Sequence, residues 1–139
     1  MKKALLSILV IVLFFLLVDF IKANVSVPRG IQIKIDEISS EYHGVISDKF
    51  AVRNTNPTHL KIITETDVIE ISPNQKIVEL AEIGDSLIKP ANENFAYLKK
   101  QNGQLHKIFY TKLSQKTRNH KSFPKEWTEN WMESSEWDK

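Results

Sequence analysis

Residues 95–110 read FAYLKKQNGQLHKIFY, and this stretch carries the clearest fold signal in the sequence. Asn102-Gly103 separates two runs in which apolar and polar residues alternate. Asparagine and glycine both tolerate the positive φ that tight hairpin turns require. The pattern therefore predicts a β-hairpin with strands over 95–100 and 105–110.

Alternating or branched apolar residues predict further strands before this hairpin. Ile31, Ile33 and Ile35 alternate with polar residues, which predicts a half-buried strand over 31–38. The other strands are expected over 44–52, 59–64, 68–72 and 86–89.

One short helix is expected within this series of strands, over 74–83. Ile77, Leu80 and Ile83 recur there at helical spacing, and Gly84 suits the residue just past a helix end. The fold class is therefore mainly β, a small sheet or partly open barrel of about six short strands with one short helix.

A long apolar segment precedes this domain. Residues 4–21 read ALLSILVIVLFFLLVDFI, with Asp19 as their only charge and Lys2 and Lys3 just before them. As a helix they would extend roughly 27 Å, close to the hydrocarbon thickness of a bilayer. We expect a single N-terminal transmembrane helix, with the membrane as its partner through residues 4–21.

Whether this segment is retained or cleaved depends on a signal-peptidase site. Cleavage after Ala23 would place the bulky Ile21 where a small residue is preferred. Residues 1–23 are therefore expected to be a membrane anchor or uncleaved signal segment of a single-pass protein in the bacterial inner membrane. The lysines at the N-terminus favour a C-terminal domain outside the cytoplasm. The alternative is a secreted or periplasmic protein after signal cleavage.

Composition excludes several classes of function. The chain has no cysteine, so it has no disulfide, no thiolate nucleophile and no cysteine-based zinc site. Its formal net charge of +2 comes from the lysines around the apolar segment, because residues 24–139 hold equal numbers of basic and acidic side chains. We expect no nucleic-acid partner. The four histidines lie in different segments without helix-ligand spacing, so neither a metal nor a cofactor is expected.

The C-terminal part differs from the β-rich domain, which is expected over 24–110. Residues 111–121 are almost free of apolar side chains, which predicts a mobile basic linker. Residues 122–139 form a Trp-rich acidic helix or tail that contains Trp127, Trp131 and Trp137. A helix would place Trp127 and Trp131 on one face. This face either docks on the domain's own sheet or contacts a protein partner or the membrane interface.

Gly84-Asp85-Ser86-Leu87 resembles the signature of the GDSL family of lipases and esterases over these four residues. The resemblance implies a serine hydrolase with Ser86 as nucleophile. The family's Gly-x-Asn-Asp block is absent, however, and no histidine after Ser86 has an aspartate three residues before it. Ser86-x-x-Lys89 also resembles the nucleophile motif of penicillin-recognising enzymes, but Pro90 disfavours the helix that this motif needs.

The order of an apolar N-terminal segment, short strands and a Gly-Asp-Ser-Leu-x-Lys stretch resembles small uncharacterised membrane-anchored or exported proteins of bacteria. That resemblance implies a fold element and no activity. The expected function is a membrane-tethered, non-enzymatic cell-envelope domain that acts through protein contacts. The alternatives are a GDSL-type hydrolase that uses Ser86 and an exported domain that binds a small ligand.

Overall fold

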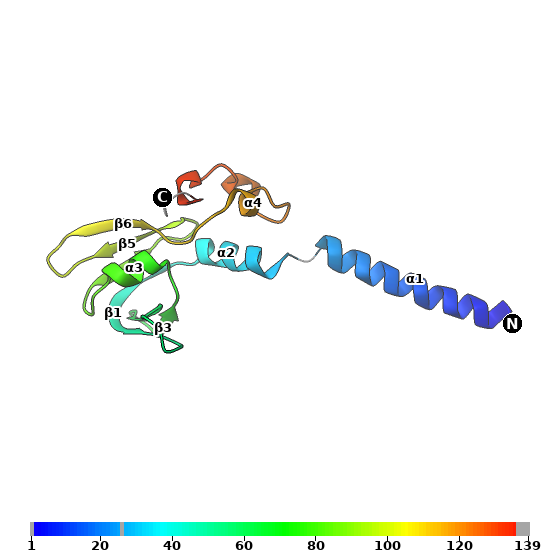
Figure 1. Cartoon of the computed structure of the whole chain (residues 1–139), viewed down its shortest axis with the longest axis horizontal. Coiled ribbons are helices and arrows are strands. Elements are labelled where there is room, and N and C mark those ends of the chain that lie inside the picture. Colours follow the sequence, from blue (N-terminus) through cyan, green and yellow to red (C-terminus); the bar gives the residue numbers. More distant parts are fainter. Residues whose placement is uncertain (1, 26, 136–139) are drawn as a thin grey trace.

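The computed structural model describes residues 2–25 and 27–135, and its centre is a six-stranded sheet (Figure 1). The strand order is β3-β2-β1-β4-β5-β6, and every neighbouring pair is antiparallel. The prediction of a mainly β fold is confirmed. The strands are β1 (Tyr42–Phe50), β2 (His59–Ile63), β3 (Val68–Ile71), β4 (Ser86–Lys89), β5 (Phe95–Lys99) and β6 (Leu105–Phe109).

β5 and β6 form the predicted hairpin around Asn102-Gly103. Lys100 N donates to Gln104 O at 2.8 Å, and Gly103 N donates to Lys100 O at 2.9 Å. Gly103 has a φ of +88°, which glycine adopts without a Cβ clash. The connection is therefore a three-residue loop with a bulge at Gly103, and only the glycine uses positive φ.

The predicted helix over 74–83 is confirmed as α3 (Gln75–Leu80), which is shorter than expected. The Asn74 side chain caps its start by accepting a hydrogen bond from Lys76 N. The helix ends at Leu80 because Ala81 has extended backbone angles, with ψ at 141°. Gly84, with a φ of +94°, therefore belongs to the turn that leads into β4 and not to the helix end.

The prediction of a strand over 31–38 is wrong, because these residues lie in α2 (Arg29–Ser39). Ile31, Ile35 and Ile38 fall on one side of that helix and pack into a hydrophobic cluster. Ile33, which completed the strand-like alternation, faces outward with 45% of its side chain exposed. Contacts four and three residues apart, from Gln32 to Asp36 and from Lys34 to Glu37, also stabilise the helix.

The two faces of the sheet have different surroundings. One face forms the main core, and α3 packs on it through Ile77 and Val78. The strand residues of this core include Ile46, Leu60, Ile62, Leu87, Ala96, Leu98 and Ile108. The opposite face carries aromatic side chains near the β5–β6 end, where the rings of Phe95 and Phe109 stack at 4.7 Å.

The segment predicted as a mobile linker, 111–121, instead contains α4 (Gln115–Arg118) and buries Leu113 completely. After it, the tail forms two 3-10 turns, η1 (Lys125–Trp127) and η2 (Met132–Ser135), in place of one continuous helix. Leu113 joins Ile38 and Phe123 in a second hydrophobic cluster. Thr111 adds two hydrogen bonds with Asn94, so this polar segment is attached through partners that lie far away in sequence.

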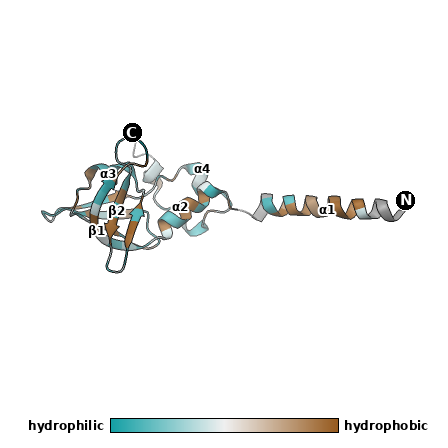
Figure 2. Ribbon diagram, turned by 90° about the horizontal axis from the view of Figure 1, so that it is seen from below, coloured by the Kyte–Doolittle hydropathy of each residue, from teal (hydrophilic) through white to brown (hydrophobic). Residues whose placement is uncertain are grey.

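The N-terminal segment forms α1 (Lys2–Val25), a helix of 24 residues, as predicted. Figure 1 draws α1 apart from the sheet, and Figure 2 shows apolar colouring along much of it. Its large apolar side chains from Ile8 to Leu17, with Phe20 and Ile21, are 47 to 66% exposed. Among the residues described, no helix has both the length and the apolar character needed to cross a membrane. That α1 crosses one stays a prediction.

Candidate functional site

Ser86, the candidate nucleophile, is the first residue of β4 and is half-buried. It lies opposite Val45 on β1 and Lys99 on β5. His43 projects from the same face of the sheet but is paired with Ile88. An activated serine needs a base within hydrogen-bond reach. Within the described part of the chain, no histidine is hydrogen-bonded to Ser86.

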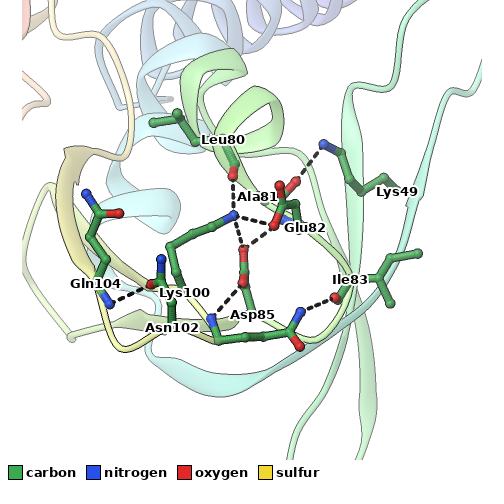
Figure 3. A network of polar contacts seen from close by, with 10 residues as sticks. Lys49, Leu80, Ala81, Glu82, Ile83, Asp85, Lys100, Asn102 and Gln104 are labelled. Carbon is green, nitrogen blue, oxygen red and sulfur yellow. Dashed lines mark hydrogen bonds and ion pairs between the residues drawn. The ribbon is translucent and has the colours of Figure 1, made fainter.

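Asp85, the residue before Ser86, is fully buried and highly connected (Figure 3). Its Oδ2 accepts hydrogen bonds from Lys100 Nζ at 2.7 Å and from Glu82 N at 2.8 Å, and its Oδ1 accepts one from Gln101 N at 3.2 Å. Burial alone would raise the pKa of Asp85. The hydrogen bonds from Lys100 and from the two backbone amides outweigh burial and hold this pKa below its usual value.

Lys100 extends this network to the end of α3. Its Nζ donates to Leu80 O at 2.9 Å and lies 3.0 Å from Glu82 Oε2. The hydrogen bond with Asp85 is the main reason that the pKa of Lys100 is raised. The Gly-Asp-Ser-Leu stretch therefore connects α3 to the β5–β6 hairpin, and its aspartate has a structural role.

Lys89 is buried and caps the C-terminal end of α2. Its Nζ donates to the carbonyl oxygens of Ile38 at 2.9 Å, Ser40 at 3.1 Å and Pro90 at 2.8 Å, and it lies 5.3 Å from the ring centre of Tyr110. Burial lowers the pKa of Lys89 to about 8. Ser86 and Lys89 are three residues apart on a strand, so they project from opposite faces of the sheet. This geometry rules out a serine–lysine dyad.

Trp127 and Trp131 pack within the chain. Their ring centres lie 6.0 Å apart, and Trp127 is also 6.1 Å from Phe123. Both tryptophans are partly buried against the cluster of Ile38, Leu113 and Phe123, so the tail docks on α2 and not on the sheet. Trp137, the third expected contact residue, lies outside the described residues. That this tail contacts a protein partner stays a prediction.

A surface cleft lies between α3 and β6. It has a volume of about 690 Å³ and is lined by Asn74, Gln75, Lys76, Glu79, Lys107, Ile108 and Phe109. Asn74 closes one end, because its side chain donates to Phe109 O at 2.9 Å and its backbone N donates to Tyr110 O. Sequence reasoning missed this cleft, since its two walls are more than twenty residues apart in sequence and their separation depends on how α3 packs.

Metal binding finds no support in the described ranges, where no group of three or more histidine and carboxylate side chains is arranged to hold an ion.

The fold and the cleft define a small antiparallel β domain with a helix beside one edge strand. Compared with known proteins, the chain matches no family model, no curated protein and no solved structure.

Proposed function

We propose that this chain is a membrane-tethered, non-enzymatic domain of the bacterial cell envelope that acts through protein contacts. The observation that carries the tether is the exposed apolar surface of α1. Burial of apolar surface contributes roughly 25 cal/mol per Å², so twelve large apolar side chains left in water would be unfavourable. Lipid is the surrounding that covers such a helix on every side.

The charges beside α1 support an orientation for the tether. Lys2 and Lys3 lie immediately before the apolar residues, whereas the folded domain follows them. The positive-inside rule favours lysines on the cytoplasmic side. In this proposal the sheet is therefore outside the cytoplasm, and a secreted or periplasmic form after cleavage is the competing outcome.

The hydrogen bonding of Ser86, Asp85 and Lys89 favours a function in protein contact over hydrolysis. Ser86 has no base within hydrogen-bond reach in the described structure, and both Asp85 and Lys89 are occupied by structural hydrogen bonds. The cleft beside β6, in contrast, combines backbone and charged groups on an accessible surface. These groups suit recognition of another polypeptide.

The tether is tested by membrane fractionation of the full chain with an alkaline wash. We expect the wild type to stay in the membrane pellet and to retain residues 4–21, as measured by mass spectrometry. Replacing Leu13 and Phe14 together by arginine should release it, because each arginine near the centre of a membrane helix costs about 2.5 to 3.5 kcal/mol.

The matched control is Val52→Arg, which adds a charge at a side chain that is 69% exposed on the domain. This variant should remain in the membrane fraction. A wild-type chain that washes off the membrane, or a mature chain that begins at or near Asn24, would disprove the tether.

A further inference from the structure

We propose that the outer edge of β6, beside α3, binds an extended segment of a partner protein that carries carboxylate side chains. The segment adds to the sheet as a further strand. This inference deepens the protein-contact function proposed above and rests on it, but it does not depend on the membrane tether.

The hairpin geometry shows which backbone groups of β6 face outward. Lys100 pairs with Gln104 through a hydrogen bond, and Tyr110 N donates to Asn94 O at the other end of the hairpin. Hydrogen-bonded and non-hydrogen-bonded pairs alternate along an antiparallel ladder. The N–H and C=O groups of Leu105 and Lys107 therefore point away from β5. Within the described structure, neither residue forms a backbone hydrogen bond on that side.

One position on this edge already has a polar partner from outside the sheet. The Asn74 side chain donates to Phe109 O, the outward carbonyl at the end of β6. Asn74 thus occupies the place that a residue of a seventh strand would take. The edge from Leu105 to Lys107 continues from there without such a partner among the described residues, so an extended segment can pair with its N–H and C=O groups.

The cleft beside this edge gives the segment a second wall. α3 lies along it with Gln75, Lys76 and Glu79, opposite Lys107 and Ile108. Alternate side chains of an added strand point to opposite faces. One set would enter the cleft between β6 and α3. The other set would lie beside Phe109 and Lys107 on the face of the sheet opposite the main core, called the uncovered face below.

The charges favour an acidic segment over a second copy of this chain. Lys107 is the central residue of β6, and its Nζ lies 4.0 Å from the ring centre of Phe95 on the uncovered face. Lys76 adds a second cation across the cleft, where Glu79 is the single acid among the described lining residues. Two β6 strands paired in the centred register would bring one Lys107 against another, and like charges directly opposite are unfavourable.

The test measures amide hydrogen exchange of the full chain in detergent micelles by NMR. The probe is a short synthetic peptide with blocked ends that alternates valine with glutamate. In the free chain we expect rapid exchange at Leu105 and Lys107 and slow exchange at Ile108, whose N–H points to β5. A saturating amount of peptide should slow exchange at Leu105 and Lys107.

Two variants test the backbone and charge contributions separately. Leu105→Pro removes an outward N–H at the first residue of an edge strand, where proline is tolerated, and should abolish binding. Lys107→Glu should weaken binding about fivefold or more by replacing attraction with repulsion. Lys116→Glu, at an exposed position of α4, makes the same change of net charge and should leave the affinity unchanged. Protection at Ile108 reports that each variant retains the hairpin.

Several outcomes would overturn the proposal. Protected Leu105 and Lys107 amides in the free chain, together with concentration-dependent oligomers, would assign the edge to a second copy. Equal binding of a valine–lysine peptide would refute the acidic partner, and unchanged binding by Leu105→Pro would refute strand addition. Because the measurement uses solubilised protein, failure here leaves the tether intact, and release from membranes leaves peptide binding intact.

Discussion

At the scale of single residues, three charged side chains connect elements that are distant in sequence. Asp85 and Lys100 join the turn before β4 to the hairpin loop, and Lys89 joins β4 to the end of α2. Each is buried or nearly so, and each has its polar atoms satisfied by hydrogen bonds. Removing one partner leaves the polar group of the other buried without a hydrogen bond. This lowers the free energy of unfolding, because an unpaired polar group is unfavourable in a low-dielectric interior.

Asp85→Asn should lower the free energy of unfolding by about 1.5 to 3 kcal/mol, because the charge-assisted bond from Lys100 is lost. The folded pKa of Asp85 lies below its unfolded value of 3.8, so this stabilisation is present above that value. It should disappear as the pH falls through the folded pKa. Urea unfolding of both proteins over a pH series measures this difference.

Glu82→Gln is the control for Asp85→Asn, because Glu82 contacts the same lysine but its side chain is 72% exposed. The expected change is below about 0.5 kcal/mol. If the two substitutions have equal effects, burial of Asp85 is not the source of its contribution.

Lys89→Met keeps the apolar stem but leaves three carbonyl oxygens without their donor. We expect a loss of about 1 to 3 kcal/mol in the free energy of unfolding. The folded pKa of Lys89, about 8, is below the unfolded value of 10.5, so the unfolded state binds more protons between these values. The free energy of unfolding of the wild type therefore rises with pH between about 8 and 10.5. Its difference from that of Lys89→Met should widen over this range.

Chemical denaturation between pH 7 and pH 10.5 measures this gap, with the exposed Lys99→Met as control. If the difference in the free energy of unfolding between the wild type and Lys89→Met narrows with rising pH, the site does not disfavour the charged form of Lys89.

At the scale of elements, α2 shows how one sequence pattern fits two periods. The isoleucines at 31, 33 and 35 match a strand, whereas those at 31, 35 and 38 match a helix. The helix forms because Leu113 and Phe123 provide a partner for the second set. The hairpin had no such ambiguity, since its turn residues and both alternating runs favour one structure.

Ile35→Ala should therefore destabilise the protein by about 2 kcal/mol, because Ile35 packs on the second cluster. Ile33→Ala changes the same residue type on the exposed side of α2 and should cost less than about 0.5 kcal/mol. Thermal unfolding of both variants checks this. Similar losses at the two positions would contradict the helical arrangement.

At the scale of the whole molecule, the tail is part of the folded domain. Phe123 is 3% exposed, and Ser134 Oγ accepts a hydrogen bond from Leu113 N at 3.3 Å. β4 connects the main core to the second cluster around α2. Its Leu87 lies in the main core, and its Lys89 donates to the carbonyl oxygen of Ile38 in the second cluster. The tail therefore packs against α2 and Leu113 up to Ser134.

Removing residues 122–139 should lower the free energy of unfolding by several kcal/mol, because each fully buried large side chain contributes about 1.5 to 3 kcal/mol. Differential scanning fluorimetry of the full and shortened chains measures the change. Met132→Ala, at a side chain that is 53% exposed, serves as the control and should have little effect. An unchanged melting temperature after truncation would mean that the docked tail adds no stability.

Features that depend on near neighbours in the chain could be predicted from the sequence. These are the helical character of α1, the strands β1 to β6 and the glycine turn at Gly103. Each follows from periodicity or backbone preference within a few residues. The mainly β fold class follows from their sum.

The remaining features depend on contacts between distant parts of the chain. α2 is a helix, the segment 111–121 is attached, Asp85 and Lys89 are structural, and a cleft opens beside β6. In each case the deciding partner lies far along the chain, as Lys89 and Ile38 do across 51 residues. Local sequence patterns do not identify such partners. Burial and hydrogen bonding across the fold contribute more free energy than local preferences, so they can override them.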